Sequence, residues 1–94
     1  MEVTINPKLT EHLELREKAL KQRDPKAMYQ LAQIYASMKG KKNEKKAYEL
    51  YKSSATHGYA EAQFRMGTCN ENGIGVKQSI RMAITWYILS LIHI

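Results

Sequence analysis

The sequence predicts an all-α fold, an α-solenoid of antiparallel helix pairs with about five helices. Three observations carry this prediction: an internal repeat, an apolar periodicity typical of helices, and turn residues where helices would begin and end. When the chain is shifted by 35 residues, the segment 24–32 falls on the segment 59–67. The matched pairs include Ala27 with Ala62, Tyr29 with Phe64, Leu31 with Met66, Ala32 with Gly67, and Gly40 with Gly75.

The repeat continues past the glycine turn, where the offset becomes 36. The pairs matched there are Ala47 with Ala83, Leu50 with Trp86, and Tyr51 with Tyr87. A loop that gains one residue is the change that repeat proteins tolerate best. The N-terminal stretch 1–23 aligns with the second helix of the repeat, and we interpret it as the second half of a preceding or capping repeat.

The predicted helices take their boundaries from capping and turn residues. Asn6-Pro7 and Asp24-Pro25 each place a capping side chain before a proline at the first helical position, where the missing N–H costs nothing. Gly58 suits the left-handed backbone that closes a helix, and further glycines mark the turns between helices. The predicted helices span about 7–22, 25–38, 43–57, 60–72 and 77–88.

A narrow apolar stripe runs along each predicted helix. In the first repeat, Ala27, Leu31 and Tyr35 recur at the spacing of one helical face, and Ala47 and Tyr51 do so in the next helix. A helix pair cannot bury such a stripe alone and must stack on neighbouring pairs, which gives a solenoid. These segments lack the alternation of apolar and polar residues that strands would show.

Composition indicates one small domain of a soluble protein in a reducing compartment. No apolar run in the 94 residues approaches the ~20 that span a membrane, and the start lacks the basic and apolar regions of a signal peptide. A single cysteine, Cys69, excludes an internal disulfide framework. We therefore expect a cytoplasmic protein.

The formal net charge of +6 is concentrated in one stretch. Six lysines and two glutamates lie between Lys39 and Lys52, which gives a local net charge of +4. The cluster Lys39–Lys46 is a candidate site for nucleic acid or another acidic surface. It lacks arginines and interleaved aromatic residues, so we rank a solvated helix face ahead of nucleic-acid binding.

The repeated residues resemble those of the Sel-1-like repeat, a relative of the tetratricopeptide repeat. The first copy carries the pattern at Ala27, Leu31, Tyr35, Gly40, Lys46, Ala47, Tyr51, Ala55 and Gly58. The second copy carries it at Ala62, Met66, Gly67, Gly73, Gly75, Val76, Ala83, Trp86 and Tyr87. The sequence departs from the pattern at Ala32, which stands in place of glycine, at Asn70, in place of tyrosine, and at Met82, in place of lysine.

The resemblance implies a superhelical scaffold that holds other proteins together. It divides the chain into an N-terminal helix at 1–23, a repeat at 24–58 and an incomplete repeat at 59–88. The expected partner is a protein or peptide. We expect no catalytic activity, cofactor, metal or small-molecule substrate.

The last six residues are treated separately. Leu89–Ile94 look like the translated adapter left by transposase-based sequencing libraries, and we expect this segment to be an artefact. The alternative is a genuine apolar helix end, with Leu91 at a position where the repeat has alanine. On the first interpretation the natural protein continues beyond Ile88 with further repeats.

No arrangement of residues predicts chemistry. His57 and Cys69 lack the spacing of a metal site or a catalytic dyad. The segment Gly73–Val76 follows a helix rather than a strand and lacks the third glycine of a nucleotide-binding loop. Glu61 and Glu71 are interpreted as surface carboxylates.

Candidate binding residues lie on the first helix of each repeat. In tetratricopeptide-like solenoids these helices line the concave face, and a rotation of 100° per residue places Gln33 and Thr68 opposite the buried stripe. The candidate contact residues are Tyr29, Gln30, Gln33, Phe64, Arg65 and Thr68. For Tyr29 and Phe64 we rank packing against the neighbouring repeat ahead of ligand contact.

Overall fold

The computed structural model describes residue 14 and residues 16–92, and every regular element in this part is helical. A short π-helical segment, η1 (Lys18–Gln22), precedes four α-helices. They are α2 (Pro25–Ser37), α3 (Lys41–Thr56), α4 (Ala60–Asn72) and α5 (Ile80–Ile92). The all-α prediction is confirmed, while the helix predicted at 7–22 falls largely outside the described residues.

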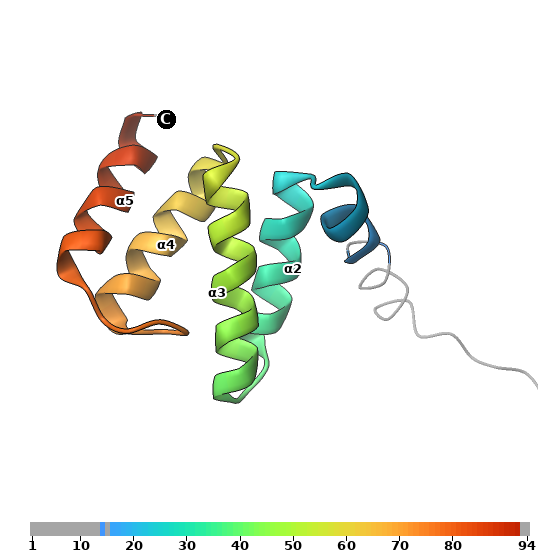
Figure 1. The fold of residues 1–94 in the computed structure, drawn as a ribbon, viewed down its shortest axis with the longest axis horizontal. Helices are drawn as coiled ribbons and strands as arrows, with labels where there is room; N and C mark the ends of the chain where they lie inside the picture. Colours follow the sequence, from blue (N-terminus) through green and yellow to red (C-terminus); the bar gives the residue numbers. More distant parts are fainter. Residues whose placement is uncertain (1–13, 15, 93–94) are drawn as a thin grey trace, which may run out of the picture.

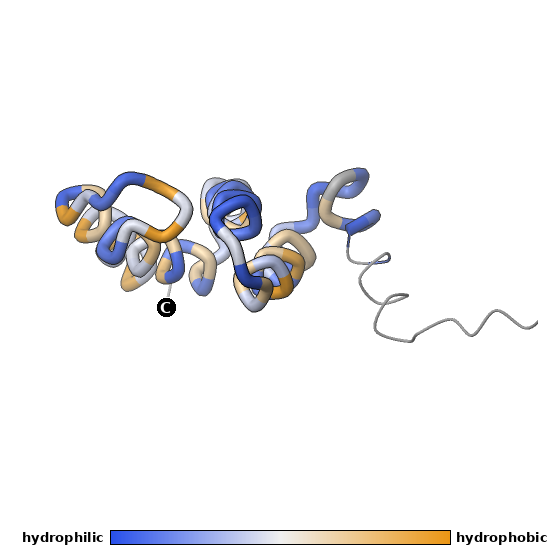
Figure 2. Tube along the Cα trace, turned by 90° about the horizontal axis from the view of Figure 1, so that it is seen from below, coloured by the Kyte–Doolittle hydropathy of each residue, from blue (hydrophilic) through white to orange (hydrophobic). Residues whose placement is uncertain are grey.

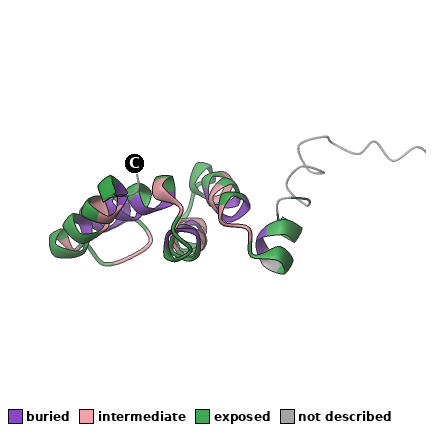
Figure 3. Ribbon diagram, turned by 90° about the horizontal axis from the view of Figure 1, so that it is seen from above, coloured by how far each residue is buried: buried purple, intermediate pink, exposed green. Residues whose placement is uncertain are grey.

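The helices stand side by side in chain order, and each packs on its neighbours in the sequence (Figure 1). Seen along the helices, α3 is displaced to one side of the row, whereas α2 and α4 lie on the other (Figure 3). Main contacts between consecutive elements are typical of a solenoid. The first helices of the two repeats therefore face the same side of the molecule.

Local capping sets the helix boundaries. The Asp24 side chain accepts a hydrogen bond of 3.1 Å from the backbone N–H of Lys26, so α2 begins at Pro25 as predicted. Helix α5 begins at Ile80, three residues later than predicted. The Ser79 hydroxyl accepts a bond of 3.2 Å from the N–H of Met82, and the Ser79 N–H donates to the carbonyl of Asn70 over 2.8 Å. These bonds hold Ser79 as the cap.

Helix α5 continues past Ile88 to Ile92, through part of the segment that the sequence analysis assigned to an adapter. His93 and Ile94 lie outside the described residues. The adapter origin of 89–94 stays a prediction. The start of α3 also differs from the prediction, because the helix begins at Lys41 directly after Gly40 rather than at residue 43.

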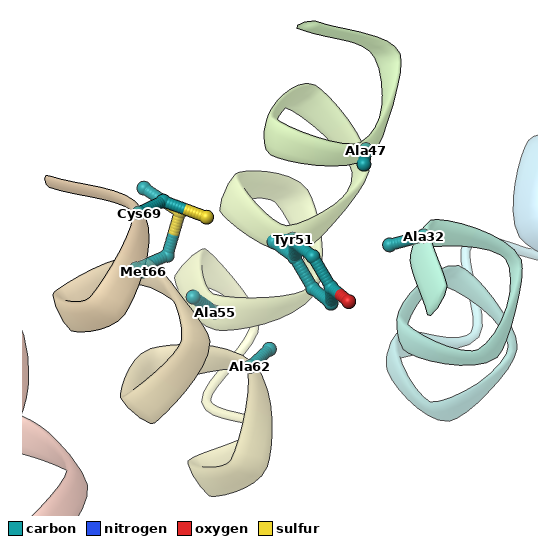
Figure 4. Close-up of a cluster of buried hydrophobic side chains, with 7 residues drawn as sticks. All are labelled: Ala32, Ala47, Tyr51, Ala55, Ala62, Met66 and Cys69. Atoms are coloured by element: carbon teal, nitrogen blue, oxygen red, sulfur yellow. The ribbon is translucent and has the colours of Figure 1, made fainter. Parts of the chain in front are cut away.

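The buried core lies between the two repeats and consists mostly of small side chains. Its members are Ala32, Ala47, Tyr51, Ala55, Ala62, Met66 and Cys69 (Figure 4). The ring of Tyr51 extends from α3 into the space between α2 and α4 (Figure 4). A second buried cluster, formed by Ala19, Ala27, Met28 and Leu31, joins η1 to α2.

A buried serine makes the same hydrogen bond in both repeats. The Ser54 hydroxyl in α3 donates to the carbonyl of Pro25 over 2.6 Å, and the Ser90 hydroxyl in α5 donates to the carbonyl of Ala60 over 3.4 Å. Each acceptor is the first residue of the first helix of its repeat. Because both serines are buried, these bonds fix where the second helix crosses the start of the first.

The turn between α4 and α5 folds back onto the first repeat. A Cβ atom added to Gly75 would lie 2.5 Å from the carbonyl oxygen of Glu44 and 2.8 Å from the Cβ of Tyr48, both in α3. The backbone of Gly75 also has a positive φ of 72°. Glycine is therefore required at this position both for the backbone conformation and for the close approach.

Glycine at position 67 is required by a different contact. A Cβ atom added there would lie 2.5 Å from the ring of Tyr87, which packs directly on the α4 backbone. The equivalent residue in the first repeat, Ala32, tolerates its methyl group and is fully buried. The two repeats therefore place their equivalent tyrosines, Tyr51 and Tyr87, differently against the first helix.

Helix α5 is apolar on most of its surface. Its exposed apolar side chains are Ile80, Met82, Ile84, Ile88, Leu91 and Ile92. Only Ala83 and Ser90 of this helix are buried. Among the described helices, none is long and apolar enough to cross a membrane.

Gln63 is a buried polar residue at the position equivalent to Met28. Its Nε2 donates to the carbonyl of Ala55 over 3.2 Å, whereas its Oε1 is buried without a partner. The same carbonyl also accepts a bond of 3.0 Å from the N–H of Gly58. Removing the Gln63 amide would therefore leave no backbone acceptor without a partner.

The glycine turn provides a matched pair of substitutions. Gly73 and Gly75 share a positive φ of about 70°, but a Cβ at Gly73 would have its nearest neighbour at 3.4 Å. Gly73→Ala should lower the free energy of unfolding by about 1–2 kcal/mol through backbone strain alone. Gly75→Ala should lower it by about 1–3 kcal/mol more through overpacking. Urea denaturation followed by circular dichroism measures both values, and equal losses would contradict the packing of this turn on α3.

Gln63→Met should stabilise the fold. Burying an acceptor without a partner costs about 1–3 kcal/mol, and methionine fills a similar volume without that penalty. We expect the free energy of unfolding to rise by about 1 kcal/mol in the same urea experiment. Gln63→Ala, which removes the amide but leaves a cavity, is the control and should destabilise. A loss of stability in Gln63→Met would show that the amide is satisfied.

Candidate binding groove between the repeats

A groove runs between α2 and α4, with Tyr51 of α3 at its floor. One part is a hollow of about 240 Å³, lined by Ala36, Glu44, Ala47, Tyr51, Arg65, Thr68, Cys69 and Ile74. A second hollow of about 340 Å³ is lined by Tyr29, Ala60, Glu61, Phe64, Arg65 and Ser90. Arg65 contributes to both hollows, and we call the two together the inter-repeat groove.

Four of the predicted contact residues, Tyr29, Phe64, Arg65 and Thr68, line this groove, and Gln33 is bonded to one of them. Gln33 Nε2 donates a hydrogen bond of 3.2 Å to the hydroxyl oxygen of Tyr29, one turn earlier on α2. Arg65 of α4 lines the same hollow as Tyr29, and interaction with the Tyr29 hydroxyl raises the pKa of Arg65. Among the residues that the structure describes, Arg65 forms no ion pair with a carboxylate. A stably charged arginine therefore lies at the junction of the two repeats.

Tyr29 packs between the repeats while its hydroxyl reaches the groove. Its ring centroid lies 5.7 Å from that of Tyr51 and 5.2 Å from that of Tyr59, both in tilted geometries. Tilted aromatic pairs at these distances stabilise an interface beyond the area they bury. Tyr29 thus packs against the neighbouring repeat and also presents a polar group to the groove.

Phe64 and Thr68, which also line the groove, contact Tyr87 of α5. The Phe64 ring, half exposed, lies 5.4 Å from the ring of Tyr87, and the two hydroxyls of Thr68 and Tyr87 are 3.3 Å apart. The Tyr87 hydroxyl donates to Glu71 over 2.7 Å. Gln30 is exposed on α2 and lines neither hollow. Of the six candidate residues, four therefore line the groove, and Gln33 is hydrogen-bonded to one of the four.

Burial keeps the groove floor neutral. Burial raises the pKa of Tyr51 to about 12, and it raises the pKa of the Cys69 thiol as well. Both groups are therefore protonated at neutral pH, and the Cys69 thiol is a weak nucleophile. His57 lies elsewhere, with Nδ1 2.7 Å from the carbonyl of Ser53. Among the described residues, no three histidine, cysteine or acidic side chains gather as metal ligands.

The lysines form a second candidate surface on the outer side of α3. Lys41, Lys45 and Lys52 share one exposed face of this helix, which is strongly hydrophilic (Figure 2). The ammonium of Lys46 lies 5.4 Å from the ring centroid of Tyr35, in a cation–π contact. This face points away from α2 and α4, and none of its lysines lines the inter-repeat groove. Glu44, which does line the groove, belongs to a different side of α3.

Sequence reasoning missed part of the groove lining. Ala36 lies one helical turn after Gln33 on the same face of α2, so the helical spacing alone was a sufficient signal. Ile74 and Glu44 reach the groove only because the turn after α4 folds back on α3. No pattern in the sequence indicated that contact.

Comparisons with known proteins bear directly on the repeats. The Sel1 repeat model matches residues 25–59 and 60–91. Chitin synthase regulatory factor 3 of Schizosaccharomyces pombe is 40% identical over 78 residues, which are 76% of this chain and 8% of that protein.

Two further relatives are similar. Chitin synthase regulatory factor 2 of the same yeast is 36% identical over 63 residues, covering 65% of this chain and 12% of that protein. Chitin synthase regulator SKT5 of Saccharomyces cerevisiae is 34% identical over 61 residues, covering 64% and 9%. The chain thus spans about a tenth of the length of these relatives. The two matches to the family model account for both helix pairs, and the chain belongs to the Sel1 repeat family.

Proposed function

We propose that this chain is a protein-interaction module that binds a peptide segment of a partner protein in the inter-repeat groove. The observation that carries the proposal is that Tyr29 of α2 and Arg65 of α4 line the same hollow, with Gln33 bonded to the Tyr29 hydroxyl. Sel1 repeats generally mediate contacts between proteins. The relatives are named as regulators of chitin synthase, and an adaptor role in a regulatory assembly agrees with those names.

The groove has the features expected of a peptide site rather than of a catalytic site. Its lining is largely apolar, with a few polar groups that can fix the orientation of a bound chain. The nucleophile that lines it, Cys69, is kept protonated by burial. We infer that the module acts by binding, in the reducing environment of the cytoplasm.

Replacing both polar anchors should remove peptide binding without unfolding the chain. Gln33 and Arg65 are exposed, so Gln33→Ala combined with Arg65→Ala should leave the far-ultraviolet circular dichroism unchanged. Peptides selected from a random phage-displayed library on the wild-type chain are the probe. We expect at least a tenfold rise in their Kd for the double variant, since a hydrogen bond to a charged group contributes about 1.5–3 kcal/mol.

The matched control is Gln22→Ala combined with Lys26→Ala, a glutamine and a cation that are exposed and line neither hollow. This variant should bind the selected peptides as the wild type does. Equal affinity of all three proteins would show that the peptides bind outside the inter-repeat groove.

The lysine face of α3 supports a second candidate function, the electrostatic binding of nucleic acid or another acidic surface. In the described part of the chain, none of these lysines forms an ion pair. A fluorescein-labelled DNA duplex titrated at several salt concentrations tests this function. Lys41→Glu combined with Lys42→Glu should weaken binding and reduce the salt slope by about 2, since each lysine on a phosphate contributes about 0.9. Binding that is indifferent to salt would exclude it.

A further inference from the structure

The Tyr29 hydroxyl is a hydrogen-bond donor without an acceptor among the described residues. Its oxygen accepts a hydrogen bond of 3.2 Å from Gln33 Nε2, and the Arg65 side chain lines the same hollow as Tyr29. No hydrogen bond donated by this hydroxyl is found within the described part of the chain. Its O–H is therefore left to point at an acceptor supplied from outside.

Arg65 adds further donors at the same point. A guanidinium carries five N–H donors in one plane, and a single neighbouring hydroxyl can accept from only part of them. The side chain is exposed and lines both hollows of the groove. A carboxylate is the acceptor that matches this planar set of donors, because it can accept two parallel bonds from arginine.

Acidic side chains lie on either side of this positive centre. Glu61 lines one hollow, one helical turn before Arg65 on α4, and Glu44 lines the other from α3. The charges along the groove therefore run negative, positive, negative. A ligand with a run of acidic residues would place like charges against Glu44 or Glu61, which disfavours its binding.

We infer that the inter-repeat groove recognises one isolated acidic side chain in an extended peptide, bound through its carboxylate by Arg65 and Tyr29. The neighbouring ligand side chains are apolar or basic. Ala36 and Ile74 receive one neighbour, and Phe64 and Ala60 the other. This inference rests on the proposed function and adds the chemistry of the ligand. It also distinguishes the ligand of the groove from that of the lysine face, which would favour a run of acidic residues.

Selection from the random phage-displayed library tests the ligand chemistry directly. The displayed peptides are fused at their C-termini, so an enriched acidic position is a side chain and not a terminal carboxylate. We expect one aspartate or glutamate, flanked by apolar or basic residues. The strongest sequence is then made as a C-terminally amidated, fluorescein-labelled peptide, together with its Asp→Asn or Glu→Gln form.

Binding of both peptides to wild type and to Arg65→Gln completes a double-mutant cycle. Neutralising the peptide carboxylate should raise the Kd of the wild-type chain about tenfold or more, and change the Kd of Arg65→Gln by less than about twofold. Tyr29→Phe keeps the ring contacts but removes the hydroxyl. Neutralising the peptide carboxylate should therefore raise the Kd of this variant by less than it raises the Kd of the wild type. Lys41→Glu combined with Lys42→Glu should bind as the wild type does.

The possible failures point to different conclusions. Enriched peptides that lack an acidic residue, or equal losses in wild type and Arg65→Gln, would overturn the inference. If those peptides still lose affinity for the Gln33→Ala and Arg65→Ala double variant, the proposed function stands and only the ligand chemistry is wrong. Failure to enrich any peptide would count against both.

Discussion

The close packing of α3 against α4 through small side chains is the contact on which the groove depends. Ala47, Ala55 and Ala62 are almost completely buried there, and their short side chains let the helix axes approach. Tyr51 is the large member of this contact, and its ring fills the space between α2 and α4 (Figure 4). Tyr29 packs on Tyr51 and lines the same hollow as Arg65 from the next repeat.

Two contacts with the backbone hold the packed helices, one near each end of α3. Ser54 ties the C-terminal part of α3 to the first residue of α2, and the turn at Gly75 lies against the N-terminal part of α3. Ile74, next to Gly75, lines the groove, so the turn that supports the repeat packing also closes one end of the binding surface. On the proposed function, stability and binding would therefore be coupled through the same loop.

The sequence predicted the parts of the structure that depend on local spacing. The repeat offset and the Asp24-Pro25 start located four of the helices, because capping and apolar periodicity act within one or two turns. The start of α5 was missed because the cap at Ser79 depends on a backbone bond to Asn70, nine residues away. Such a contact becomes visible only once the path of the turn is known.

The candidate site was predicted only in part for a similar reason. Helical rotation identified Gln33, Tyr29 and Arg65 as residues outside the buried stripe, but it gave no information on which of them meet across α2 and α4. That depends on the separation and rotation of two helices, which the buried alanines and Tyr51 determine together. Phe64 and Thr68, chosen by the same rule, line the groove and also contact Tyr87, because Gly67 lets that ring approach α4.

The two repeats share their inner positions and differ at their outer ones. Ala47 and Ala83 are equally buried, whereas the exposed Lys46 and Lys52 of α3 correspond to the exposed Met82 and Ile88 of α5. Packing constrains the residues of the inner set, because even one added methylene group disturbs a close-packed interface. It leaves the outer set free to vary.

Arg65 is one of these variable exposed positions, and it belongs to the proposed binding site. Its equivalent in the first repeat is Gln30, which is exposed and lines neither hollow, although both occupy the same position of the repeat pattern. What distinguishes Arg65 is the Tyr29 hydroxyl presented by the preceding repeat. The proposed binding site is therefore a property of the junction between two repeats, and on this proposal replacing one exposed side chain at a junction should change the ligand without changing the stack.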